Sequence, residues 1–348
     1  MNLALPDDRF PEVAVRGTSA ARGQAHGETL RAPIRETFTF YMERLFAGGP
    51  LDRAAIEARA ERVAAMVRTM TPVLADEIEG IAAGAGLPDW QIYVLNARTE
   101  ILNARVGECS ALYFAKSHVL AQTWDWVEPL EALCAVITHE REDGHRYVSL
   151  VEPGMLAKIG MNDAGIGVCL NILFAPHDLS GLPVHVLIAA VLHARDFSAA
   201  RRVMETAGLG KASHLLVADG AGKGVSMEFM GDERHALMPQ NGVLLHTNHC
   251  LAHGVAGRRQ DLGHSCARYD RLVAAVADLP TQDLATARAI LSGPQAGAAT
   301  LLQPYHEQSL LGNERVGTCA TVMMELDERR FHIRRGPGAD APFSCVAL

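Results

Sequence analysis

Cys109 stands at a change of pattern in the chain. The segment Gly107-Glu108-Cys109-Ser110 ends a helical stretch and begins a strand-rich one. A thiol forms covalent acyl intermediates readily when a base takes its proton and a third group orients that base. Asp125 follows sixteen residues later, between two tryptophans, on the strand that we expect to pair with the strand after Cys109. A single cysteine at a strand start is most often structural. The other polar segments of the chain must therefore show whether Cys109 is catalytic.

Three more polar residues lie beside apolar strands. Asn171 closes the strand that follows Gly160–Gly165, Asn248 lies in His246–Cys250 after another strand, and Arg315 directly precedes the last hairpin. A side-chain amide can donate hydrogen bonds to an oxyanion without adding charge. A guanidinium can bind a carboxylate. The plain alternatives are a turn-forming asparagine at a strand end and a solvated arginine.

The order and spacing of these segments resemble the acyl-coenzyme A:6-aminopenicillanate acyltransferase family, cysteine N-terminal-nucleophile (Ntn) hydrolases that are related to choloylglycine hydrolases. The resemblance runs from about residue 94 to 336 and is strongest at WDW (124–126), GMNDAGIG (160–167) and HTNHC (246–250). It implies that Cys109 is the nucleophile, that Asp125 orients its α-amino group and that Asn248 donates to the oxyanion. Asn171 matches only the related choloylglycine hydrolases. Arg315 matches an active-site arginine of the family, and it could bind a substrate carboxylate or stabilise the site electrostatically.

Such enzymes activate themselves. The resemblance implies a cut between Glu108 and Cys109, in which the thiol attacks the Glu108 carbonyl and water then hydrolyses the thioester. The freed α-amino group, with a reference pKa near 7.7–8.0, then serves as the base for its own thiol. We therefore expect a self-processing hydrolase that hydrolyses or transfers an acyl group of an N-acyl amide or acyl thioester.

The chain departs from the family's pattern at Glu108, Met230 and Glu314. The penicillin substrate is therefore not carried over, and an acyl-CoA-dependent N-acyltransferase stays open as an alternative. Two remoter alternatives are a non-enzymatic binding protein and a metal-dependent hydrolase. The latter would use the histidines His246, His249, His253 and His264, although no HExxH pattern accompanies them.

Composition excludes several classes. A net charge of −8 leaves no basic footprint for nucleic acid. No apolar run approaches the roughly 20 residues of a membrane span. The start of the chain lacks a secretory pattern, and the seven scattered cysteines form no CxxC pair, so we expect a cytoplasmic protein with reduced thiols. No cofactor or metal is predicted.

Hydrophobic periodicity predicts the elements that must position these residues. An amphipathic stripe covers Ala54–Ala83 and is divided at Pro72, and another helix begins at Asp89. Further helices are expected over Pro183–Ala194, Ser198–Ala207, Cys266–Ala277 and Asp283–Leu291. Strands are expected over Glu12–Arg16, Ser110–Phe114, His118–Thr123, Ala132–His139, Tyr147–Val151, Gly165–Leu170, His214–Ala218, Val225–Met230, Val243–His246, Thr318–Glu325 and Arg330–Arg335.

Grouped strands and grouped helices favour an α+β fold. The resemblance implies a four-layer αββα sandwich. We expect residues 1–108 to be a helical small subunit and residues 109–348 the catalytic large subunit, with both forming one structural domain. The amphipathic stripes need a partner face, so the small subunit should stay bound as a heterodimer after the cut. A higher oligomer is left open.

Overall fold

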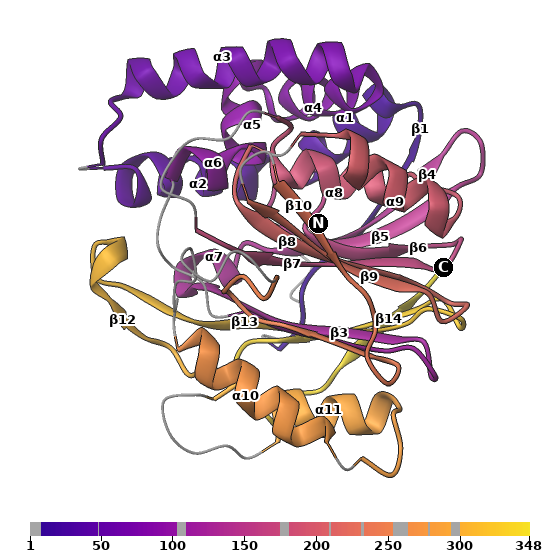
Figure 1. The fold of residues 1–348 in the computed structure, drawn as a ribbon. Coiled ribbons are helices and arrows are strands. Elements are labelled where there is room, and N and C mark those ends of the chain that lie inside the picture. The colour runs from indigo at the N-terminus through magenta and orange to yellow at the C-terminus, as the bar shows by residue number, and fades with distance from the viewer. Residues whose placement is uncertain are drawn as a thin grey trace.

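The computed structural model describes residues 8–47, 49–102, 109–174, 181–208, 210–230, 233–252, 264–277, 279–293 and 300–348. Two β-sheets lie face to face, with helices on both outer sides (Figure 1). The expected α+β fold with four layers in the order αββα is confirmed. Within the described part of the chain, no helix is both long and apolar enough to cross a membrane.

The first sheet contains eight strands in the order β1-β4-β5-β6-β7-β8-β9-β10. Adjacent strands of this sheet run antiparallel, except that β1 and β4 are parallel, with Val13 opposite Ile137. The strands are β1 (Glu12–Gly17), β4 (Ala135–Arg141), β5 (Arg146–Val151), β6 (Ile159–Asn162), β7 (Ile166–Ile172), β8 (Ser213–Asp219), β9 (Gly224–Met230) and β10 (Glu233–Leu237).

The second sheet has the order β11-β2-β3-β13-β14-β15, with β12 paired to β13. All of its pairs are antiparallel, and Ser110 of β2 lies opposite Thr123 of β3. The strands are β2 (Ser110–Phe114), β3 (Val119–Val127), β11 (Val243–His246), β12 (His306–Gln308), β13 (Glu314–Glu325), β14 (Arg330–Arg335) and β15 (Ser344–Ala347).

The helical layers cover opposite sides of the sandwich (Figure 1). The N-terminal helices and α8 and α9 cover the first sheet, and α10 and α11 cover the second. The helices are α1 (Ser19–Thr29), α2 (Arg31–Phe40), the π-helix η1 (Tyr41–Leu45), α3 (Arg53–Met70), α4 (Pro72–Ala85), α5 (Asp89–Asn96), α6 (Arg98–Leu102), the single-turn α7 (Glu128–Glu131), α8 (Val184–Leu192), α9 (Phe197–Thr206), α10 (Ser265–Val276), α11 (Leu284–Ser292) and the 3₁₀ turn η3 (Ser309–Leu311).

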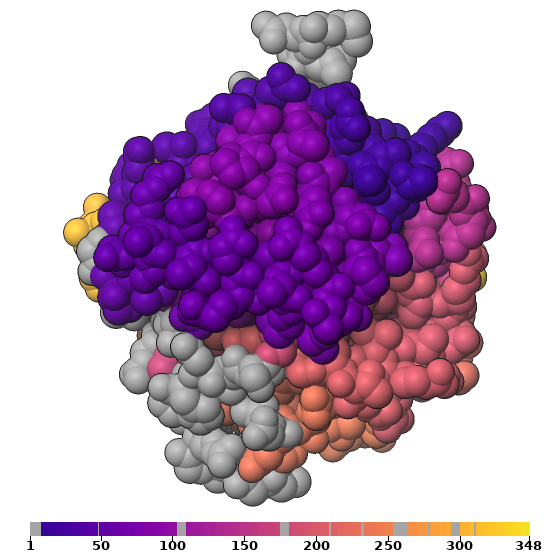
Figure 2. All heavy atoms as spheres, turned by 90° about the horizontal axis from the view of Figure 1, so that it is seen from above, coloured from indigo at the N-terminus to yellow at the C-terminus, as the bar shows by residue number. Residues whose placement is uncertain are grey.

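Glycines bring α1 and α4 into close contact. A Cβ atom on Gly80 would lie 2.4 Å from the carbonyl oxygen of Ala20, and one on Gly23 would lie 2.1 Å from that of Glu77. Only glycine allows backbones to approach this closely. In Figure 2 the indigo and purple N-terminal part of the chain covers one face of the molecule.

The space between the sheets is filled mainly by apolar side chains, and a few hydrogen bonds cross it. Tyr113 of β2 donates its hydroxyl to the carbonyl oxygen of Asp219 at 3.1 Å. Gln122 of β3 donates its side-chain amide to the carbonyl oxygen of Leu170 in β7. These bonds fix the lateral position of one sheet on the other. The end of β7 and the residues directly after β11 consequently meet near the start of β2.

Candidate functional site

Cys109 directly precedes β2 and is 5% exposed, with its side chain in the core. Its strand is buried along all five residues, because one face meets the other sheet and the other face meets the outer helices. Glu108, the expected residue on the other side of the cut, lies outside the described residues. The thiol therefore sits at the buried edge of a strand rather than in a surface loop.

Asp125 lies in β3, next to the strand of Cys109, and is 2% exposed. Burial, followed by the negative charge of Asp125, raises the pKa of the Cys109 thiol to about 11. The backbone amide of Asp125 and the cations Arg268 and Lys158 act in the opposite direction. In the uncut chain the thiol is thus protonated near neutral pH, and its reaction requires a proton acceptor.

Asn171, near the end of β7, reaches Cys109 directly. Its side-chain Nδ2 donates to the Cys109 carbonyl oxygen at 3.0 Å. Its Oδ1 lies 3.0 Å from Nδ1 of His214, whose Nε2 lies 2.6 Å from the Ser226 hydroxyl. An amide oxygen only accepts, so His214 must carry its proton on Nδ1 and accept from Ser226. This chain of bonds turns the Asn171 amide nitrogen toward Cys109.

Asn248 follows β11 and is 1% exposed. Its Oδ1 accepts from Nη2 of Arg268 at 2.9 Å, and its Nδ2 donates to the carbonyl oxygen of Ile172 at 3.0 Å. Arg268 also donates from Nη1 to the Cys109 carbonyl oxygen at 2.7 Å. The same guanidinium thus joins Asn248 to the cysteine, and Ile172 is the neighbour of Asn171.

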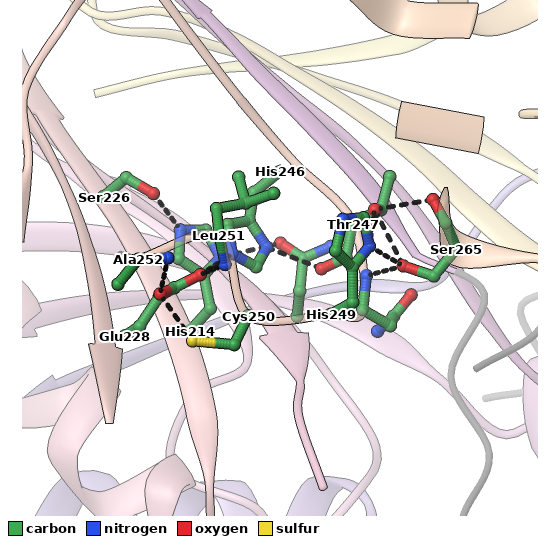
Figure 3. A network of polar contacts seen from close by, with 12 residues as sticks. His214, Ser226, Glu228, His246, Thr247, His249, Cys250, Leu251, Ala252 and Ser265 are labelled. Carbon is green, nitrogen blue, oxygen red and sulfur yellow. Dashed lines mark hydrogen bonds and ion pairs between the residues drawn. The ribbon is translucent and has the colours of Figure 1, made fainter. Parts of the chain in front are cut away.

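The segment His246–Ala252, which carries Asn248, is held at both of its ends (Figure 3). Before it, Nε2 of His246 lies 2.9 Å from Oε1 of Glu228. After it, the same carboxylate accepts from the backbone amides of Leu251 at 2.6 Å and Ala252 at 3.0 Å, and from the Cys250 thiol at 2.9 Å. Burial would raise the pKa of Glu228, but His246 outweighs it and lowers the pKa to about 2. The Glu228 carboxylate, ionised near neutral pH, therefore anchors the segment His246–Ala252 to β9.

Ser265, the first residue of α10, holds the middle of the segment His246–Ala252 (Figure 3). Its hydroxyl oxygen accepts from the backbone amide of Asn248 at 2.6 Å and lies 2.7 Å from Nδ1 of His249. Thr247 donates to the Ser265 carbonyl oxygen at 2.9 Å. The backbone of Asn248 is therefore fixed independently of its side chain.

Arg315 lies apart from these contacts. Its side chain is 53% exposed and pairs with Glu128 at 2.7 Å. A second contact goes to the carbonyl oxygen of Tyr305 at 3.4 Å. Within the described residues, the structure therefore joins Cys109 to Asp125, Asn171 and Asn248 but shows no contact that joins Arg315 to them.

Sequence reasoning missed Arg268 and His214. Arg268 lies on the buried face of a helix, one turn before Leu272, so a charged residue on an apolar stripe was the available signal. His214 lies in a strand that is buried throughout, and nothing local distinguishes it from a core histidine.

Two of the four histidines that could suggest a metal site have other contacts. His246 pairs with Glu228, and His249 contacts Ser265. His264 precedes α10, and His253 lies outside the described residues. Among the residues that the structure describes, no three His, Cys, Asp or Glu side chains are arranged to hold a metal ion.

Comparisons with known proteins give a consistent result. The sequence pattern of the acyl-coenzyme A:6-aminopenicillanic acid acyl-transferase family matches residues 114–339, well over half of the chain. The acyl-coenzyme A:6-aminopenicillanic-acid-acyltransferase 40 kDa form of Emericella nidulans is 27% identical over 271 residues, which cover 75% of each protein.

Two solved structures are similar at low identity. A variant of the conjugated bile acid hydrolase from Clostridium perfringens is 11% identical, with a TM-score of 0.49 over 69% of this chain and 92% of that one. The N-acylethanolamine-hydrolyzing acid amidase ortholog from Caenorhabditis elegans is 14% identical, with a TM-score of 0.45 over 63% and 93%.

Proposed function

Because the chain belongs to the acyl-coenzyme A:6-aminopenicillanic acid acyl-transferase family, we propose that it hydrolyses or transfers an amide-linked acyl group through a thioester on Cys109, after cutting itself before that residue. The observation that carries the proposal is the set of contacts around Cys109. Its carbonyl oxygen accepts from Asn171 at 3.0 Å and from Arg268 at 2.7 Å, and Asp125 lies on the neighbouring strand.

The first step is self-cleavage. The Cys109 sulfur attacks the carbonyl carbon of Glu108, the peptide C–N bond breaks, and the thiol proton passes to the departing nitrogen. Water then hydrolyses the thioester and leaves a carboxylate on Glu108, a free thiol and a free α-amino group. That amine is poised near neutral pH and can accept the thiol proton in later turnovers.

Turnover then uses the same sulfur. The thiol gives its proton to the α-amino group and attacks the substrate carbonyl, and the amide nitrogen leaves with that proton. The Asn171 and Asn248 amides are the proposed donors to the oxyanion, and Asp125 orients the α-amino group. Arg315 would act farther out, where its guanidinium could bind a substrate carboxylate.

Water or an amine resolves the acyl-enzyme, and this choice separates the two candidate activities. Water gives an amidohydrolase, and an amine acceptor gives an acyltransferase. The name of the Emericella relative favours the second possibility, with an acyl-CoA as donor. We place hydrolysis first, because water needs no second binding site.

Contacts across the proposed cut support a heterodimer. Residues before it supply β1, which extends the first sheet beside β4. The buried Glu152 carboxylate accepts from Arg98 at 2.8 Å and from Tyr41 at 2.5 Å. Asn96 donates to the carbonyl oxygen of Gly154 at 2.9 Å. An N-terminal fragment that contributes a strand and buried ionic contacts should stay bound after cleavage.

A panel of N-acyl amides and acyl thioesters tests the activity. Wild-type protein should release free acid from at least one chemical class, and Cys109→Ala should release none. Adding an amine acceptor distinguishes hydrolysis from transfer by the product formed. Equal release by both proteins would remove Cys109 from the mechanism.

A further inference from the structure

Arg268 is the one guanidinium that contacts Cys109 within the described residues. It is fully buried, although it belongs to the first turn of α10. A cation in the first turn of a helix is opposed by the helix dipole, so helix stability does not explain its position. Its bonds leave the helix and reach the cysteine carbonyl at 2.7 Å and the Ser110 hydroxyl at 2.9 Å.

The other end of the guanidinium reaches the oxyanion candidate. Nη2 donates to Oδ1 of Asn248 at 2.9 Å. A guanidinium has donors and no acceptor, so only the amide oxygen of Asn248 can face it. The Asn248 NH₂ group is therefore directed to the opposite side. Arg268 thus fixes the position of Cys109 and the orientation of Asn248 at the same time.

We infer that Arg268 is the positioning residue of the nucleophile, and that its fixed positive charge favours the unprotonated forms of the Cys109 thiol and of its freed α-amino group. This inference rests on the proposed function, because the α-amino group exists only after the cut. A nearby cation stabilises a thiolate and destabilises an ammonium. Arg268 therefore lowers both pKa values, and the enzyme keeps its base active at lower pH.

Other charged and titratable groups face Cys109 from each neighbouring element. Asp125 on β3 opposes Arg268, Lys158 ahead of β6 acts with it, and Cys169 lies on β7. Burial, followed by the charge of Cys109, raises the pKa of Cys169, so that thiol stays neutral. Asp125 already acts on the Cys109 thiol more strongly than Arg268 does, and removing Arg268 would leave Lys158 as the cation that opposes it. A unit charge about 5 Å away at an effective dielectric constant of about 20 shifts a pKa by about 2 units.

The test compares Arg268→Gln with a matched control. Arg334 is equally buried and also donates to one carbonyl, that of Ala339, and to two side-chain hydroxyls. Iodoacetamide alkylation of Cys109 is followed against pH by mass spectrometry of its peptide. We expect Arg268→Gln to raise the midpoint by about 1–2 pH units. Arg268→Lys, which keeps the charge, and Arg334→Gln should stay near the wild-type midpoint.

An unchanged midpoint in Arg268→Gln, or an equal rise in Arg334→Gln, would overturn the inference. If Arg268→Gln does not fold, Arg268→Lys decides, because a rise of 1–2 pH units there would show that charge is not the cause. Intact mass of the same samples separates the two proposals. Uncut wild-type protein refutes self-cleavage, whereas cut protein with an unmoved midpoint refutes only the role of Arg268.

Discussion

Replacing Glu152 by glutamine should destabilise the protein strongly, although the two side chains have nearly the same shape. The carboxylate is fully buried and accepts from Arg98, Lys158 and Tyr41. Arg98 and Tyr41 belong to the N-terminal helices, and Glu152 follows β5, so the contact fastens that layer to the first sheet. The substitution leaves two buried cations without their anion, which costs about 3–5 kcal/mol.

The pKa of Glu152 gives a second estimate of the stability that this carboxylate contributes. Burial alone would raise its pKa, but Arg98 and Lys158 outweigh burial and lower the pKa from 4.5 to about 2. A shift of this size corresponds to about 3 kcal/mol of stability. Because the folded pKa is depressed, this contribution is present above about pH 4.5 and is lost as the pH falls toward 2.

Urea unfolding measures this directly. The protein with Glu152 and the Glu152→Gln variant are both made on a Cys109→Ala background, so that each is one uncut chain. The free energy of unfolding should fall by about 3 kcal/mol in Glu152→Gln at pH 7, and the difference should shrink below pH 4.5. Glu79→Gln is the control, because Glu79 pairs with the half-exposed Arg68 and should cost about 1 kcal/mol or less. A loss of unfolding free energy in Glu152→Gln as small as that of the control, or a loss that does not change with pH, would refute the reasoning.

Three shorter predictions follow from other contacts. Asn248→Ala should lower turnover by about 10²–10³ without a matching loss of melting temperature, if the amide donates to the oxyanion. Asp125→Asn should slow turnover more than self-cleavage in a timed gel assay, because the amine that it orients exists only after the cut. Gly80→Ala should destabilise the chain by about 2 kcal/mol or more in urea, since its Cβ would meet the Ala20 carbonyl at 2.4 Å. Gly338→Ala, whose Cβ would come no closer than 3.6 Å to its neighbours, should change stability by less than about 0.5 kcal/mol.

Local pattern predicted much of the fold, because alternation and breakers act over a few residues. The expected strands Ser110–Phe114 and Val243–His246 match β2 and β11. The stripe over Ala54–Ala83 divides at Pro72, where the structure ends α3 and begins α4. The expected strand His118–Thr123 was too short, because β3 continues to Val127 beside β13. That pairing partner lies almost 200 residues away, and no local signal reports it.

The contacts between distant segments could not be predicted from local sequence pattern. The approach of Asn171 to Cys109 depends on how one sheet lies on the other. Arg268 reaches the cysteine from α10, across 159 residues of chain. Arg315 shows the converse, since its place beside the last hairpin was expected but its observed partner is Glu128. Residue types and order identify candidates, and only the packed layers show which of them touch.

Intact mass spectrometry of the purified protein tests the central claim most directly. We expect wild-type protein to appear as two fragments divided between Glu108 and Cys109, with the larger one beginning at the cysteine. Cys109→Ala should remain a single chain of 37.5 kDa. Cys250→Ala, whose thiol contacts Glu228, should be cut like the wild type. A split Cys109→Ala chain beside an intact Cys250→Ala chain would show that the nucleophile is elsewhere.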